Sequence, residues 1–116
     1  MPIIKTADVE FTPGSVPNTL RRLLVCPDSG SGAITLGELI MEPGAELPMH
    51  THRIEESMVI VEGEATAILD NEIFNLKPRD VILVSAGEKH LLANRSNKPM
   101  SFLFFYPSVD VQLERV

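Results

Sequence analysis

The sequence predicts one all-β domain, an antiparallel sandwich or barrel. Its 116 residues, taken together, are the length of a single domain. Nine prolines and seven glycines are spread along the chain and divide it into pieces too short for most helices. These pieces are apolar or alternate between apolar and polar residues, and none shows a helical period with caps. Strands separated by turns roughly every 8–12 residues indicate a sandwich or barrel.

Most of the expected strands end at a turn signal. The expected strands are residues 20–25, 33–41, 57–61, 64–69, 72–76, 81–84, 91–94 and 100–106. Proline and glycine mark turns at residues 42–44 and 77–80. Asp70 and Asn71 suit a tight hairpin because both tolerate the left-handed backbone conformation. The first dozen or so residues are ambiguous.

The strand at residues 100–106 is rich in aromatic side chains. Alternation divides them between two faces: Phe102, Phe104 and Tyr106 on one, and Leu103 and Phe105 on the other. We expect one face to lie in the core, and the other could pack on a partner chain.

Composition argues against two classes of partner. The net charge is −6 and the ten Lys and Arg residues are scattered, so the chain lacks the dense basic surface that phosphate backbones require. No apolar run approaches the roughly 20 residues of a membrane-spanning helix. The N-terminus lacks a signal-peptide layout, and the single cysteine, Cys26, cannot form an intramolecular disulfide. We therefore expect a cytoplasmic protein with neither nucleic-acid nor membrane partners.

Three histidines and one glutamate form the candidate site. The only histidines are His50, His52 and His90. Side chains alternate along a strand, so His50 and His52 point to the same face. Glu56 follows four residues later and could add a carboxylate oxygen, whereas His90 would come from a distant strand of a closed barrel. Each of these residues alone is more often a surface or hydrogen-bonded side chain, so the prediction depends on the four together.

This ligand set predicts a metal cofactor. Three neutral imidazoles and one carboxylate suit one divalent transition metal, such as Fe, Mn, Ni, Zn or Cu. Four protein ligands leave open positions on a six-coordinate ion, where substrate, water or dioxygen can bind. Walls of Val, Ile, Leu and Met would keep the pocket dry and strengthen the polarising effect of the ion.

The spacing of these residues resembles the first motif of the cupin superfamily, G-x5-H-x-H-x3-E-x6-G. Every fixed position is filled, by Gly44, His50, His52, Glu56 and Gly63. The spacing selects Glu56 rather than Glu55 as the ligand.

The second cupin motif, G-x5-P-x-G-x2-H-x3-N, is matched in part. Three fixed positions are filled, by Gly87, His90 and Asn94, while Arg79 and Ser85 stand where the motif has glycine and proline. A glycine at the first position would ease a turn through positive φ, so we expect a turn of a different type around Arg79. Neither departure affects a ligand, and both concern the shape of a loop near the pocket mouth.

The two motifs, at residues 44–63 and 79–94, cover nearly half of the chain. The resemblance implies a double-stranded β-helix, the jelly-roll barrel of small single-domain cupins, with the metal inside it. It also implies the ligands, which are His50, His52, Glu56 and His90.

The C-terminal tail predicts a homodimer. Val109, Val111 and Leu113 alternate with polar residues, and an edge strand must be paired or covered. Dimers are frequent among similar small cupins, so we expect the tail to pair at a dimer interface.

Four further side chains could contact a substrate. Arg21, Arg22 and Arg53 could each bind a carboxylate through two hydrogen bonds, although at least two of them are expected to be ordinary surface charges. Tyr106 could supply a hydroxyl to a substrate, but we expect it instead to pack on one face of its strand. No residue outside the metal shell stands out as a general base.

The sequence predicts a metal-dependent enzyme that acts on a small oxygen-bearing molecule. The metal would bind neighbouring oxygens of an acid, diketone, enol or phenol, and either activate dioxygen or polarise the substrate. The small one-barrel cupins that this chain resembles include dioxygenases, isomerases, cyclases and lyases. The alternative is a non-catalytic module that binds or senses a small molecule. A purely structural role is the weakest hypothesis because open metal positions serve no packing purpose.

Overall fold

The computed structural model describes residues 1–111 and the backbone of residues 113–115. This part of the chain forms strands and two short 3-10 helices, η1 (Thr6–Asp8) and η2 (Pro27–Ser29). The strands are β1 (Thr12–Pro13), β2 (Thr19–Val25), β3 (Thr35–Met41), β4 (Glu46–His52), β5 (Glu56–Glu62), β6 (Ala65–Leu69), β7 (Glu72–Leu76), β8 (Val81–Val84), β9 (His90–Ala93), β10 (Met100–Tyr106) and β11 (Leu113–Arg115). The all-β prediction is confirmed. Among these residues, no helix has the length and apolarity that a membrane crossing would need.

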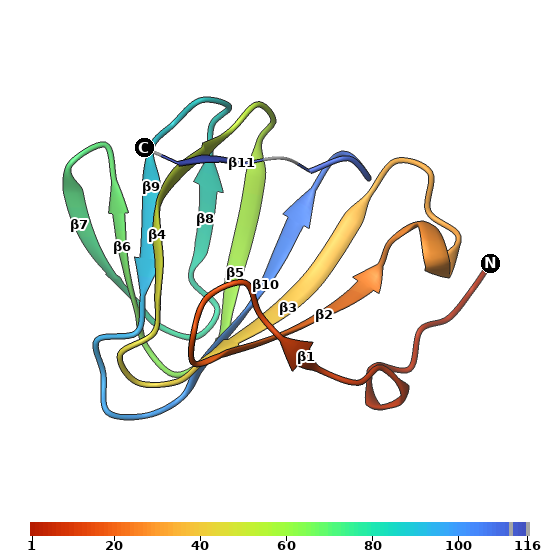
Figure 1. Cartoon of the computed structure of the whole chain (residues 1–116), viewed down its shortest axis with the longest axis horizontal. Coiled ribbons are helices and arrows are strands. Elements are labelled where there is room, and N and C mark those ends of the chain that lie inside the picture. The colour runs from red at the N-terminus through yellow and green to blue at the C-terminus, as the bar shows by residue number, and fades with distance from the viewer. Residues whose placement is uncertain (112, 116) are drawn as a thin grey trace.

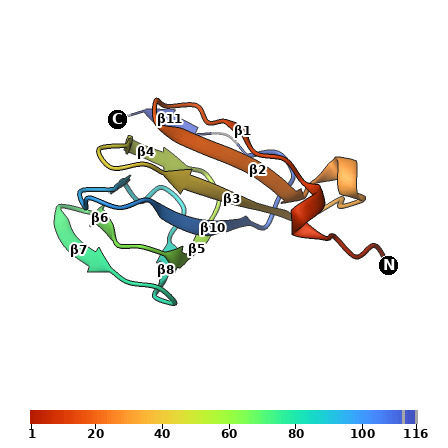
Figure 2. The same ribbon diagram turned by 90° about the horizontal axis from the view of Figure 1, so that it is seen from below.

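The strands form two antiparallel sheets. One sheet has six strands in the order β1-β2-β3-β10-β5-β8, and the other has five in the order β11-β4-β9-β6-β7. Figures 1 and 2 show β6 and β7 at one end of the molecule, far from η1 and the N-terminus. The consecutive strands β3 and β4 lie in different sheets, while β10 returns to pair with β3. This arrangement is the predicted double-stranded β-helix of a jelly roll.

Alternation along the strands creates the interior. In β3 every second side chain is buried and the others are half-buried. In β10 the side chains of Phe102, Phe104 and Tyr106 are buried, whereas Leu103 is half-buried and Phe105 is exposed. The predicted division of this aromatic strand into two faces is therefore correct, with the first set in the core.

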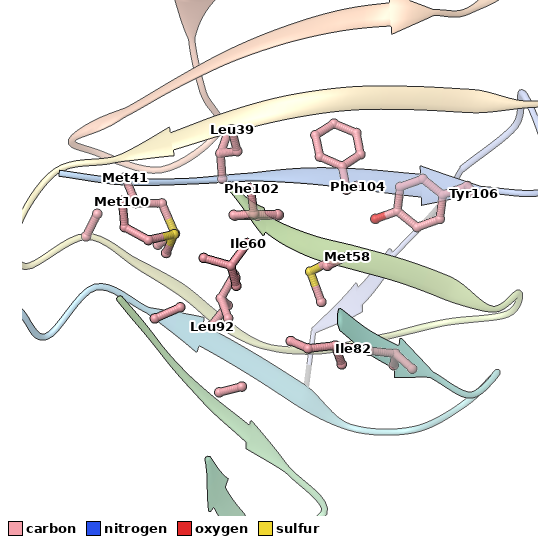
Figure 3. Packing of buried hydrophobic residues seen from close by; sticks show 14 residues of the cluster. Leu39, Met41, Met58, Ile60, Ile82, Leu92, Met100, Phe102, Phe104 and Tyr106 are labelled. Carbon is pink, nitrogen blue, oxygen red and sulfur yellow. The ribbon is translucent and has the colours of Figure 1, made fainter. Parts of the chain in front are cut away.

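The core fills the space between the sheets, as Figure 3 shows. Leu39 of β3, Phe102 of β10 and Ile60 of β5 stand opposite one another on three neighbouring strands. Each is at most 5% exposed. Gly37 makes room for the ring of Phe104, because a Cβ at position 37 would lie 2.2 Å from that ring. A larger residue there would push the ring out of its place beside the site described below.

Two turns test expectations from the sequence. Asp70 and Asn71 have φ angles of 46° and 72° and connect β6 to β7, so the predicted hairpin is confirmed. The expectation of a different turn type at Arg79 is wrong. Arg79 has a φ of 75°, the left-handed conformation that glycine favours. Its N–H donates a hydrogen bond of 2.7 Å to the carbonyl of Ile60, which holds the residue in this conformation.

The C-terminal tail pairs within the chain. β11 lies antiparallel to β4, with Leu113 opposite His52 and Arg115 opposite His50. It forms the edge of the five-stranded sheet. Residues 109–111 form no strand, and position 112 lies outside the described residues. The expected homodimer stays a prediction.

Candidate metal centre

β4 presents two of the three histidines to the interior of the barrel. The side chains of His50 and His52 are only 8% and 5% exposed. Their ring centres lie 4.9 Å apart. β4 is flanked by β9 on one side and β11 on the other, so its backbone is held from both sides. The two rings occupy one region of the interior, as alternation along a strand predicted.

The other two residues come from different strands and from both sheets. His90 begins β9 and stands directly opposite His50, with the ring centres 4.1 Å apart. Glu56 begins β5 in the six-stranded sheet, whereas the three histidines belong to the five-stranded one. Each of the four buried residues offers a ligand atom, and these atoms all lie within 4.8 Å of one another. The jelly-roll topology thus gathers His50, His52, Glu56 and His90 into one cluster.

Backbone carbonyls orient two of the imidazoles. Nδ1 of His50 lies 2.8 Å from the carbonyl oxygen of Pro48, and Nδ1 of His90 lies 3.0 Å from that of Glu88. A carbonyl only accepts, so each Nδ1 carries the hydrogen and donates it. In the neutral form of either ring, Nε2 then carries the lone pair, which is the arrangement that binds a metal.

Imidazole nitrogens and a carboxylate oxygen meet at the centre of the cluster. Among the described residues, Nε2 of His90 is buried without a hydrogen-bond partner, although Oε1 of Glu56 lies 3.3 Å away. The same Oε1 lies 3.4 Å from Nε2 of His52. An imidazole lone pair and a carboxylate repel each other unless a proton or a metal ion lies between them. Ligand atoms about 2.1 Å from one ion lie up to roughly 4 Å apart, so small side-chain rotations would fit this donor set to a divalent metal.

Burial and neighbouring groups set the protonation states. Burial raises the pKa of Glu56, but hydrogen bonds to its carboxylate from neighbouring side chains, that of His52 first, outweigh burial and bring the pKa to about 2. Burial is the main cause that lowers the pKa of His50 below its usual 6.5. At neutral pH the cluster therefore offers an ionised carboxylate and a neutral His50, as metal ligation requires.

Tyr106, for which the sequence did not favour a role at the site, borders the cluster. Its hydroxyl lies 3.2 Å from Nε2 of His52, and the two ring centres lie 5.1 Å apart. Burial, followed by the negative charge of Glu56, raises the pKa of Tyr106, so the hydroxyl is neutral and can donate a hydrogen bond. Alternation grouped Tyr106 with Phe102 and Phe104 on one face of the strand, and the structure shows that this face is the buried one. Its contact with β4 depends on how the two sheets face each other.

A cavity of about 390 Å³ opens beside the cluster. His52, Glu56 and Tyr106 form one part of its wall. The remaining wall comes from β1, the loop before β2, the inner face of the six-stranded sheet, β4 and the chain after β10: Pro13, Gly14, Ser15, Arg21, Leu39, Phe102, Phe104, Leu47 and Val111. The wall is mainly apolar, as expected, but aromatic residues of β10 take the place of the expected Ile and Met. A small molecule in this cavity would meet His52 and Glu56.

The three candidate arginines have different surroundings. Arg21 borders the cavity. Arg22 forms an ion pair with Glu38, with 2.6 Å between Nη2 and Oε1. Arg53 is exposed and is not among the residues that line the cavity. Arg22 and Arg53 therefore do not line the cavity, although Arg22 is a half-buried, ion-paired side chain and not the ordinary surface charge that was expected.

The asparagine of the second motif has a structural position. Asn94 is 0% exposed. Its Nδ2 donates to the carbonyls of Met41 and Lys98 at 2.8 and 2.7 Å, and its Oδ1 accepts from the N–H and hydroxyl of Ser96 at 3.0 and 2.7 Å. These bonds fasten the loop between β9 and β10 to the end of β3. The sequence marked Asn94 only through its place in the motif.

Comparisons with known proteins agree with this geometry. The model of a family described as the cupin domain matches residues 37–106. The uncharacterized protein MJ1618 of Methanocaldococcus jannaschii is 32% identical over 106 residues, which cover 89% of this chain and 85% of that protein. A gentisate 1,2-dioxygenase of a Ralstonia species is 33% identical over 103 residues, which cover 81% of this chain but 28% of that enzyme. The polyketide cyclase RemF from Streptomyces resistomycificus has the same fold, with a TM-score of 0.91, 21% identity, and coverage of 100% of this chain and 85% of that chain.

The family match includes everything that builds the cluster. Residues 37–106 are more than half of the chain and contain all four residues of the cluster together with Tyr106. The two sheets of the jelly roll and the spacing of the histidines lead to the same conclusion. This chain belongs to the cupin domain family.

Proposed function

We propose that this cupin is a metal-dependent enzyme that acts on a small molecule through oxygen atoms of the substrate. His50, His52, Glu56 and His90 would hold one divalent transition metal. The observation that carries the proposal is that this cluster is buried yet borders a cavity through His52 and Glu56. A structural metal site is closed by its protein ligands, whereas a catalytic site keeps an open position.

The residues around the cluster have separate tasks in this proposal. The carbonyls of Pro48 and Glu88 keep His50 and His90 in the tautomer that directs Nε2 toward the ion. The neutral Tyr106 hydroxyl can donate a hydrogen bond to an oxygen that gains negative charge beside the cluster. The aromatic wall of β10 would limit the access of water when a ligand fills the cavity, and this would strengthen these interactions. When bound, the metal supplies Lewis-acid polarisation or activation of dioxygen.

The named relatives support an enzymatic role and suggest two reaction classes. One is oxidation with dioxygen, the class that the name of the gentisate 1,2-dioxygenase indicates. The other is isomerase- or lyase-like chemistry without an oxidant, which is closer to the polyketide cyclase RemF. Because this chain spans 28% of the dioxygenase, the substrate of that enzyme is not carried over.

Metal content tests the first part of the proposal. We expect about one divalent ion per chain when the protein is purified without a metal-chelating tag and analysed by inductively coupled plasma mass spectrometry. Glu56→Gln should lower the content to less than about a tenth, because it removes the single anionic ligand. Glu55→Gln is the matched control, since Glu55 is exposed and should not affect the metal. A native protein that takes up none of Fe, Mn, Ni, Zn or Cu would overturn the proposal.

Turnover tests the second part. The metal-loaded protein is incubated with diketones, catechols and hydroxy acids while oxygen uptake and product masses are followed. Oxygen uptake with Fe, Cu or Ni would assign the dioxygenase class. Conversion without oxygen uptake, with Mn or Zn, would assign the isomerase or lyase class. Binding without conversion of any compound would favour the non-catalytic binding module instead.

A further inference from the structure

Arg21 places a positive charge on the inner face of the six-stranded sheet. It stands opposite Leu39 of β3, which in turn stands opposite Phe102 of β10. Residues directly opposite each other in an antiparallel pair share a face, so Arg21 lies on the same face as two buried core residues. Its side chain borders the cavity and is exposed to water. The charge therefore lies at the cavity mouth.

The neighbouring Arg22 is an arginine with a structural role. Its guanidinium pairs with Glu38 and donates hydrogen bonds to the carbonyls of Thr6 and Val9. It also lies 4.2 Å from the ring centre of Phe11. These contacts fasten the N-terminal segment to β2. Most of its hydrogen-bonding capacity is used within the chain, so Arg22 is not available to a ligand.

Arg21 has no comparable set of partners. Among the described residues it forms no ion pair, and its guanidinium carbon lies 5.7 Å from the ring centre of Phe104. An arginine over an aromatic ring keeps its N–H groups free to bond outward. The fork of N–H donors in a guanidinium matches the two oxygens of a carboxylate.

The charges of the cavity wall favour an anion. Among the described residues, Arg21 is the only basic Lys or Arg side chain of the wall and Glu56 is the only acidic one. A divalent ion bound by Glu56 and neutral imidazoles leaves a net positive charge at the metal centre, and Arg21 adds to it. The whole chain, by contrast, carries a charge of −6. A locally positive cavity in an acidic protein attracts anionic ligands to that cavity.

The aromatic residues of β10 connect the two charged ends of the cavity. Phe102 lies in the same row across the sheet as Arg21, and Tyr106 lies beside Glu56. Phe104 stands between them in β10, and all three border the cavity. A flat ring could pack along this wall with one end at Arg21 and the other at the cluster.

We propose that Arg21 binds a carboxylate of the substrate while oxygen atoms at the other end of the same molecule meet the metal centre. This inference rests on the proposed function and names its substrate class. The substrate is a small, flat organic acid with neighbouring hydroxyl or carbonyl oxygens at a distance from its carboxylate. Arg21 is a specificity residue that contacts the substrate away from the reacting atoms.

Calorimetric titration of the metal-loaded protein, without oxygen to prevent turnover, tests this inference. The probes are 3,4-dihydroxybenzoate, 3,4-dihydroxyphenylacetate and 4-methylcatechol, which share two neighbouring hydroxyls and differ in the carboxylate. The wild type should bind one of the acids roughly 10- to 100-fold more tightly than 4-methylcatechol. Arg21→Met should abolish this preference and leave the affinity for 4-methylcatechol unchanged. Arg21→Lys should restore part of the preference, because it keeps the charge and loses the fork.

Arg95→Met is the matched control, because it removes one exposed positive charge away from the cavity and should keep the full preference. The inference is overturned if the wild type prefers neither acid, if no probe binds, or if the preference survives in Arg21→Met. The metal content of the same samples distinguishes the two proposals. If the metal-loaded protein binds 4-methylcatechol as tightly as the two acids, the proposed function stands and the proposed role of Arg21 is wrong. If the protein takes up no metal, both the proposed function and the role of Arg21 are wrong.

Discussion

Two buried polar clusters lie at the two ends of β9, and they differ in how their atoms are bonded. Just past its C-terminal end, Asn94 donates and accepts hydrogen bonds entirely within the chain. At its start, Nε2 of His90 is buried without a hydrogen-bond partner among the described residues and faces Glu56. Polar groups that are fully hydrogen-bonded make a fold rigid. An imidazole lone pair that faces a carboxylate instead needs a proton or a metal ion between them. We therefore interpret the Asn94 end of β9 as structural and the His90 end as the proposed metal centre.

The largest expected effect is at the binding end. His90→Gln should lower metal affinity about 1,000-fold, or roughly 4 kcal/mol, because one of four ligands is replaced by a weak one. The free energy of unfolding of the metal-stripped protein should fall much less, by about 1–2 kcal/mol, because Nδ1 loses its hydrogen bond to the carbonyl of Glu88 while Nε2 has none to lose. A competing chromophoric chelator measures the affinity, and urea unfolding measures the stability. Unchanged metal affinity would contradict the comparison.

The structural end should show the opposite pattern. Asn94→Ala should lower the free energy of unfolding by about 3 kcal/mol, because the carbonyls of Met41 and Lys98 lose their donor in a buried place. Metal affinity of the folded variant should stay within about threefold of the wild type. Asn97→Ala, at an exposed position of the same loop, is the control and should change stability by less than about 0.5 kcal/mol. A loss of metal as large as that of His90→Gln would show that the two ends act as one unit.

Acid should lower the free energy of unfolding through the residues of the binding end and not through the Asn94 cluster. The pKa of Glu56 is lowered from 4.5 to about 2, so the unfolded chain takes up this proton first, and the stabilisation present above pH 4.5 is lost as the pH falls toward 2. The lowered pKa of His50 adds a loss that begins below pH 6.5. Urea unfolding of the metal-stripped protein should show that Glu56→Gln removes roughly 2–3 kcal/mol of the acid loss between pH 5 and 2. The cost of Asn94→Ala should be the same at pH 7 and pH 5, because no group of that cluster titrates there.

The smallest effect concerns the turn at Arg79. Arg79→Gly should raise the free energy of unfolding by about 0.5–1 kcal/mol, because glycine adopts a φ of 75° without the steric cost that arginine meets. The gain is smaller than that cost, since glycine also makes the unfolded chain more flexible. Arg95→Gly, where φ is not positive, should be neutral or destabilising. Thermal unfolding of both variants measures the difference, and equal midpoints would remove the strain argument.

Much of the fold and the cluster could be predicted because both depend on spacing. Alternation put Phe102, Phe104 and Tyr106 on one face of their strand, and the two-residue separation of His50 and His52 put both rings on one face. These are short-range rules that hold for any strand with one buried side.

The rest depended on how distant strands meet. Alternation puts Arg21 and Arg22 on opposite faces of β2 but does not say which face is inside, and pairing with β3 decides it. The contact of Tyr106 with His52 joins two sheets, so no local pattern encodes it. At Arg79, a backbone hydrogen bond to Ile60 overrides the local preference of arginine.

The pairing of β11 with β4 has a consequence for the integrity of the cluster. Since neighbouring side chains on a strand face opposite ways, a slip of β4 by a single residue would turn both of its imidazoles away from Glu56 at once. On the β9 side, the ladder has an irregularity between Leu47 and His50, so that pairing alone constrains the ligands weakly. β11 pairs with residues 50–52 without interruption and acts as a second clamp on the same segment. Cutting or reshaping the last few residues of this sequence should therefore weaken metal retention through alignment of the backbone alone.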